Sequence, residues 1–176
     1  MAKAEAVTTY KQITDDLKNR NFKPIYLLMG EEPFYLDQLS ERLQNGILEE
    51  SERSFNQLVL YGKDTDFVSV INACRRFPMM SNFNVVMLKE AQELKSIAEL
   101  SHYTEKPLSS TILVIVYKYK NLDARTKLYK SIQEKGCIFE SKRLYEDQVV
   151  GWIEKYLKAK GCSIDVTGCA LLAEYL

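Results

Sequence analysis

The residues best placed to do chemistry follow the first strongly apolar segment of the chain, residues 24–30. This segment ends at Gly30, and Glu31 and Glu32 come directly after it. In an open parallel sheet, the loop after the first strand commonly binds phosphates, and a phosphate-binding loop needs the spacing G-x-x-x-x-G-K-[ST]. Residues 35–37, Tyr-Leu-Asp, occupy the positions of that second glycine, the lysine and the hydroxyl residue. Because the two carboxylates would also repel phosphate, we expect this loop to bind no nucleotide and no other cofactor.

The same acidic pair allows a different chemistry. Phospho-receiver domains hold magnesium with carboxylates after the first strand, and they phosphorylate an aspartate at the end of the third. Here the third apolar segment is followed by Lys89 and Glu90, so the acceptor aspartate is missing. A solvated loop before a helix that starts at Pro33 explains Glu31 and Glu32 equally well. A phospho-receiver-like or other doubly wound ligand-binding domain that uses this pair stays open as the alternative.

Residues that could form a metal site or a nucleophilic centre are scattered along the chain. There is one histidine, His102, and the four cysteines contain no C-x-x-C pair. A zinc site needs closely spaced ligand pairs, and a catalytic triad needs a nucleophile, a base and an orienting acid. We therefore expect no metal, no catalytic residue and reduced thiols.

The most unusual stretch is residues 75–83, Arg-Arg-Phe-Pro-Met-Met-Ser-Asn-Phe. It carries Phe77, Met79 and Met80 around Pro78, which indicates an apolar tip rather than a continuous helix. Methionine and phenylalanine are favoured at adaptable binding surfaces, although the same residues could pack beneath a sheet. Both interpretations stay open on the pattern alone.

The elements that must position these residues alternate regularly. Strands are expected at 24–30, 55–61, 85–88, 111–117 and 137–139. Helical spacing of apolar residues occurs at 10–17, 33–48, 66–76, 94–100 and 123–135. Such alternation predicts an α/β fold, with a mostly parallel five-stranded sheet and helices on both faces.

The pattern changes after Lys142, where only helical segments follow. One runs from Asp147 to Lys160 and another, capped by Asp165 or Thr167, reaches Leu176. We place a domain boundary here, giving a domain at 1–142 and the start of a small all-helical domain at 143–176. Because the last helix stops without a cap, we expect the chain to be cut from a longer protein.

Composition narrows the function classes further. Of 176 residues, 46% are hydrophobic and 27% charged, which excludes a mainly disordered chain. Lys and Arg total 24, as do Asp and Glu, and this neutral balance disfavours a stand-alone nucleic-acid binder. A DNA-interaction module stays open as a third hypothesis, because small basic clusters occur around Lys118, Lys120 and Lys142. No signal peptide is recognisable and the longest apolar run, 111–116, is too short to span a membrane, so we expect a cytoplasmic protein.

Taken in order, several stretches resemble the delta subunit of the bacterial DNA polymerase III clamp loader. They are Pro24–Leu36, Phe77–Met80 with the following Val85–Leu88, Asp123–Tyr129 and Val149–Leu157. The resemblance covers essentially the whole chain. It implies a RecA-like, AAA+-type domain at 1–142 without a functional phosphate loop, a truncated helical domain at 143–176, and an absent C-terminal collar domain.

The resemblance also implies a function. Members of this family do not hydrolyse ATP; they are non-catalytic parts of the DNA polymerase III holoenzyme that grip the sliding clamp, the beta subunit, and help to open its ring during DNA replication. Further implied partners are the other clamp-loader subunits and, within the complex, DNA. The family grips the clamp with adjacent bulky apolar residues on a helix before the third strand, which by position are Met79 and Met80, with Phe77 beside them. The usual residues are leucine and phenylalanine, so the two methionines are a departure.

Overall fold

The computed structural model of the chain describes residues 7–144 and 146–174. These residues form two compact units, one ending at Lys142 and the other beginning at Arg143. Among the described residues, no helix has the length and apolar character needed to cross a membrane.

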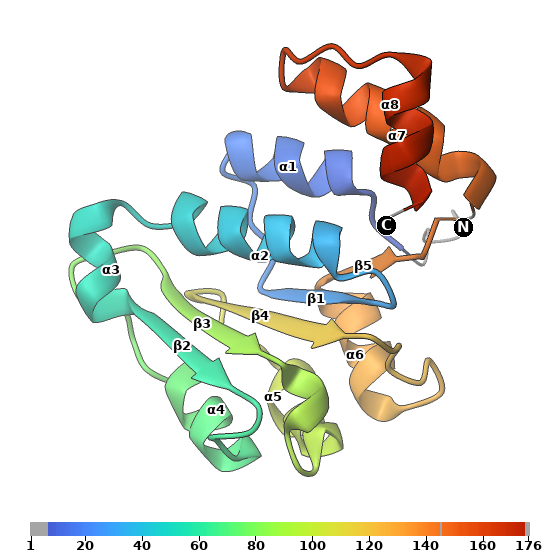
Figure 1. Ribbon diagram of the computed structural model, residues 1–176. Coiled ribbons are helices and arrows are strands. Elements are labelled where there is room, and N and C mark those ends of the chain that lie inside the picture. The colour runs from blue at the N-terminus through green and yellow to red at the C-terminus, as the bar shows by residue number, and fades with distance from the viewer. Residues whose placement is uncertain (1–6, 145, 175–176) are drawn as a thin grey trace, which may run out of the picture. The chain divides into compact units, whose positions relative to one another are not determined.

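The first unit is built around a parallel sheet with the strand order β2-β3-β4-β1-β5 (Figure 1). The strands are β1 (Ile25–Gly30), β2 (Gln57–Tyr61), β3 (Asn84–Lys89), β4 (Thr111–Lys118) and β5 (Cys137–Ser141). Each neighbouring pair is parallel; β1 lies between β4 and β5, with Tyr26 opposite Val114 on one side and Cys137 on the other. The expected α/β class and five-stranded sheet are confirmed.

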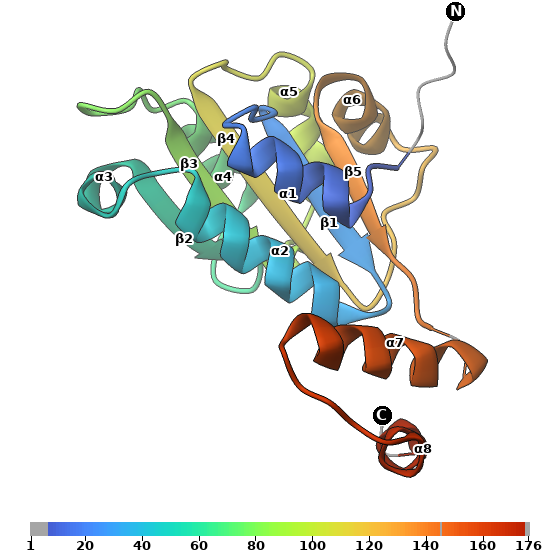
Figure 2. The ribbon, with the colours of Figure 1, turned by 90° about the horizontal axis from the view of Figure 1, so that it is seen from above.

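Helices cover both faces of this sheet. They are α1 (Tyr10–Lys18), α2 (Pro33–Gly46), α3 (Glu50–Asn56), α4 (Phe67–Cys74), α5 (Ser101–Thr104) and α6 (Lys127–Lys135), with 3-10 turns at Ala91–Glu93 and Ile97–Leu100. Figure 2 shows α1 and α2 lying over one face, while α4, α5 and α6 lie under the other in Figure 1.

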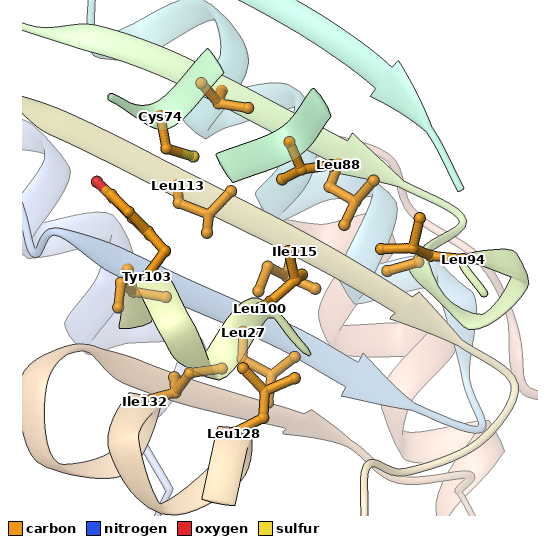
Figure 3. Close-up of a cluster of buried hydrophobic side chains, with 14 of the residues drawn as sticks. Leu27, Cys74, Leu88, Leu94, Leu100, Tyr103, Leu113, Ile115, Leu128 and Ile132 are labelled. Carbon is orange, nitrogen blue, oxygen red and sulfur yellow. The ribbon is translucent and has the colours of Figure 1, made fainter. Parts of the chain in front are cut away.

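Each face of the sheet has its own apolar core, because successive side chains of a strand point to opposite sides. Leu113 and Ile115 of β4 belong to the core under α4, α5 and α6, which Figure 3 shows in close-up. Ile112 and Val114 of the same strand belong to the core under α1 and α2. The unbroken apolar run of β4 is therefore the pattern of a strand buried on both faces.

Three local expectations were wrong. The segment predicted as a strand from Phe55 begins two residues later, because α3 occupies the preceding residues. At the start of α3 the Glu52 carboxylate accepts a hydrogen bond from the Glu49 amide. The helix expected at 94–100 is replaced by the 3-10 turns and the short α5. The helix expected from Asp123 begins at Lys127, since Thr126 is its cap and Asp123 instead binds Arg125.

The second unit contains α7 (Glu146–Ala159) and α8 (Val166–Glu174), as the helical pattern predicted. Asp165 caps α8 by accepting a hydrogen bond from the Gly168 amide at 2.7 Å. Among the described residues of this second unit, the buried apolar side chains are Ile153 and Cys169. The predicted end of the last helix, residues 175–176, lies outside the described residues.

Candidate functional site

The segment at 75–83 projects three large apolar side chains into solvent. It joins α4 to β3 and lies at the amino end of the strands, beside α3 (Figures 1 and 2). Phe77 is 80% exposed, Met79 is 58% exposed and Met80 is fully exposed. We call residues 77–80 the apolar tip. The interpretation that these side chains pack beneath the sheet is therefore wrong.

The apolar tip is a loop, as Pro78 predicted, and the helix that the resemblance implied for Met79 and Met80 is absent at these residues. The last helical residue of α4 is Cys74, and Arg75 is its C-terminal cap. Pro78 has no N–H for a helical hydrogen bond and disfavours helical geometry at the residue before it. Met80 adopts φ +55°, a left-handed conformation that cannot continue a right-handed helix.

Buried polar side chains tie this loop to its surroundings. At its base, Asn84 Nδ2 donates to the Ala73 carbonyl and Thr111 Oγ1 donates to the Cys74 carbonyl, both at 2.9 Å. At its tip, Asn56 hydrogen-bonds to both backbone polar groups of Met79. None of these three residues stands out in the sequence, where Asn56 is recognisable only as an amide inside a segment expected to be an apolar strand.

The loop after β1 is unsuited to phosphate. Glu32 is the N-cap of α2, and its Oε1 accepts from the Phe34 amide at 3.1 Å, so a carboxylate already occupies the electropositive end of the helix. Gly30 forms an antiparallel bridge with Lys120. Its backbone also lies so close to β5 that a Cβ atom there would be 2.0 Å from the Ser141 carbonyl oxygen. A carboxylate thus caps the helix end that a phosphate-binding loop would leave free for its ligand.

The acidic pair that suggested magnesium chemistry is divided by the structure. Glu32 serves as a helix cap, whereas Glu31 is exposed. No cluster of three or more His, Cys, Asp or Glu side chains in the described part of the chain is arranged to hold a metal ion. At the end of β3, Glu90 has φ +52° and no aspartate is present.

The two thiols of the first unit are buried, whereas its histidine is exposed. Burial raises the pKa of Cys74 and of Cys137 to about 12, so both remain protonated thiols of low reactivity. His102 is exposed, with its Nε2 3.0 Å from Glu99 Oε2. The structure brings none of these groups into a nucleophile–base pair.

The basic residues are dispersed as well. Lys118 is largely buried and its Nζ lies 2.6 Å from Asp37 Oδ1. The Lys120 ammonium lies 5.7 Å from the centre of the Tyr117 ring, and Lys142 is exposed near the unit boundary. Because Lys118 is neutralised by its partner, these residues give little support to a continuous surface for DNA phosphates.

A hollow of about 480 Å³ lies at the carboxyl ends of the strands, where α/β sheets usually bind ligands. Its walls mix basic and acidic side chains, among them Lys89, Glu90, Glu41 and the Lys118–Asp37 pair. This arrangement favours neither an anion nor a cation. The hollow is at the opposite end of the strands from the apolar tip.

Comparison with known proteins identifies the family. The family model for the DNA polymerase III delta subunit matches residues 26–142, which is more than half of the chain. The chain belongs to the DNA polymerase III delta-subunit family. A curated relative, DNA polymerase III subunit delta of Bacillus subtilis, is 25% identical over 138 residues, covering 73% of this chain and 40% of the relative.

Solved structures agree on the fold. The Bacillus subtilis DNA clamp loader delta protein superposes with a TM-score of 0.74 at 21% identity, covering 93% of this chain and 51% of that protein. A DNA polymerase III gamma-subunit-related protein of Thermotoga maritima gives a TM-score of 0.53 at 14% identity, covering 92% and 57%. The chain thus spans about half or less of the delta proteins that it matches.

Proposed function

We propose that this chain is the amino-terminal part of a non-catalytic clamp-loader subunit, which binds the sliding clamp through the apolar tip and helps to open the clamp ring during DNA replication. The proposal rests on one observation: Phe77, Met79 and Met80 each expose more than half of their surface on an anchored loop. The chain that carries this loop belongs to the delta family. Exposed apolar side chains gathered on one loop are typical of a protein interface.

The energetics of such a contact are adequate. Burying one large apolar side chain contributes about 1.5–3 kcal/mol, so Met79 and Met80 together would contribute about 3–6 kcal/mol. Each 1.4 kcal/mol or so corresponds to a tenfold change in affinity. Two methionines can therefore act as hot spots within an interface whose other contacts are nearly neutral.

The domain types and the partners that we propose are those expected for the delta-subunit family. The first unit would be the RecA-like, AAA+-type domain without a functional phosphate loop, and the second the start of a small helical domain. Glu32 at the start of α2 disfavours nucleotide binding at this loop. That this subunit has no cofactor and no catalytic activity by itself remains an expectation from the family. The expected partners are the sliding clamp, the other clamp-loader subunits and, indirectly, DNA in the cytoplasm.

A binding measurement tests the proposal directly. The chain is passed over the immobilised sliding clamp from the same genome, beside a Met79→Ser, Met80→Ser double variant. Tyr119→Ser is the matched control, because Tyr119 is also a large exposed side chain (65%) but follows the carboxyl end of β4. Circular dichroism checks that all three proteins fold.

We expect wild type and Tyr119→Ser to bind equally, and the double variant to lose at least about a hundredfold in affinity. If the double variant bound the clamp as tightly as the wild type, the clamp contact would lie outside the apolar tip. Absence of binding by the wild type would contradict clamp binding by this part of the subunit.

A further inference from the structure

We propose that Asn56 is the positioning residue of the apolar tip: its side-chain amide holds the backbone at Met79 so that the methionines are presented to a partner. The proposal rests on the proposed function, because it assigns how the clamp-contacting loop is kept ready to bind. It concerns a residue that precedes Met79 by 23 positions and belongs to a different element, α3.

Asn56 makes three side-chain hydrogen bonds in this place, two as donor and one as acceptor. Its Oδ1 accepts from the Met79 amide at 2.6 Å, and its Nδ2 donates to the Met79 carbonyl at 2.9 Å. Nδ2 also donates to the Glu52 carbonyl in α3 at 3.1 Å, which fixes the orientation of the amide group. The side chain therefore pairs with Met79 as the backbone of a neighbouring strand would.

The position of Asn56 makes these bonds strong determinants of loop geometry. The residue is only 2% exposed, so water does not compete freely for its amide. Met79 and Met80 direct their side chains into solvent and thus contribute little packing that could hold the loop. Met80 has a left-handed backbone, and such a conformation persists only when the surroundings impose it.

The other anchors act on neighbouring parts of the segment. The Glu52 carboxylate of α3 accepts a hydrogen bond from the Ser81 side chain, directly after the tip. Asn84 and Thr111 bind the Ala73 and Cys74 carbonyls and so hold the end of α4, several residues before the tip. Asn56 alone, among the side-chain hydrogen bonds found in the described residues, reaches the backbone of Met79. A loop that is held in its binding conformation loses less conformational freedom on association, and this raises affinity.

Two variants and two readouts test the proposal. Asn56→Ala removes all three hydrogen bonds, and Asn56→Asp keeps an acceptor oxygen but has no N–H to donate to the Met79 carbonyl. Thr104→Ala is the matched control, since it removes a buried polar side chain that instead contacts Ser131 of α6. Affinity for the sliding clamp and hydrogen–deuterium exchange of the Met79 amide are measured for each protein.

We expect the wild-type Met79 amide to exchange slowly, and Asn56→Ala to exchange fast there and to bind the clamp about tenfold more weakly. Asn56→Asp should also bind more weakly than wild type, whereas Thr104→Ala should bind like wild type. Unprotected exchange of Met79 in the wild type would overturn the proposal even if a variant fails to fold.

Comparison with the methionine variant separates this proposal from the proposed function. If Met79→Ser, Met80→Ser loses binding while folded Asn56→Ala binds normally, the clamp contact stands and the role of Asn56 is wrong. If neither change affects binding, both proposals are wrong.

Discussion

At the scale of single residues, buried polar side chains and one glycine control geometry that apolar packing leaves undetermined. Asn56, Asn84 and Thr111 account for three of the eight buried polar residues in the described chain, and all three support the segment at 75–83. Gly30 has the corresponding role at the other end of the strands, where it allows β1, β5 and the loop after β4 to meet.

The residue-scale prediction concerns Gly30. Gly30→Ala would place a Cβ atom 2.0 Å from the Ser141 carbonyl oxygen, at a backbone φ of +142° that disfavours any side chain. We expect the free energy of unfolding, measured in urea, to fall by about 2–4 kcal/mol.

Gly151→Ala is the matched control, because its Cβ would meet no atom within 4 Å and it lies inside α7. There we expect a gain of about 0.5–1 kcal/mol in the stability of the helical unit. A Gly30→Ala protein as stable as the wild type would contradict the close approach of β1 to β5.

At the scale of elements, α4 sets where the apolar tip begins, and its amino end depends on one carboxylate. Asp66 caps α4 by accepting from the Ser69 amide at 2.7 Å. The hydrogen bond from the Ser69 amide lowers the pKa of Asp66 below its ordinary value, and a hydrogen bond from the Ser69 side chain lowers it further by a smaller amount. A lowered pKa in the folded state means that ionised Asp66 stabilises the fold above its unfolded-state pKa, and that this stabilisation is lost as the pH falls.

Asp66→Asn tests this cap, since asparagine keeps an acceptor oxygen but carries no charge. We expect the variant to melt below the wild type at pH 7, and the difference in Tm to shrink as the pH falls below about 4. Melting curves across this range provide the measurement. A difference in Tm that stays constant with pH would show that the charge of Asp66 has no part in stabilising α4.

At the scale of the whole molecule, the described members of the two apolar cores of the sheet all precede the unit boundary. Their last members are Ile138 and Phe139, whereas Lys142 and Arg143 are exposed. Limited trypsin digestion should therefore first release a stable fragment that ends at Lys142 or Arg143, identified by its mass. Early cleavage inside the sheet domain would contradict an independently folded first unit.

A second whole-molecule prediction concerns nucleotide. Because Glu32 occupies the start of α2, millimolar MgATP should leave the Tm unchanged. Ligand present at about a hundred times its Kd would add about 2.7 kcal/mol to stability, which a thermal shift detects easily. A clear rise in Tm with MgATP would contradict the proposed lack of nucleotide binding. It would instead support the alternative hypothesis that the domain binds a ligand.

The class of fold and the absence of a phosphate-loop motif follow from the sequence alone. Apolar runs of strand length between helical patterns are local properties, and so are the missing glycine and lysine after Gly30. The error at α3 has the same local cause, since this short polar helix carries little apolar periodicity. At α6 the periodicity is clear, and the error lies in the cap, which is Thr126 and not Asp123.

The exposure of the apolar tip depends on tertiary structure. The pattern at 75–83 fits a packed loop and an exposed one equally, because exposure depends on what the rest of the chain places nearby. Met79 is hydrogen-bonded to Asn56, which is 23 residues away in the chain, and the strand order β2-β3-β4-β1-β5 also places consecutive strands, β1 and β2 and likewise β4 and β5, apart in the sheet. Such pairings arise when the sheet assembles, and no local spacing of residue types encodes them.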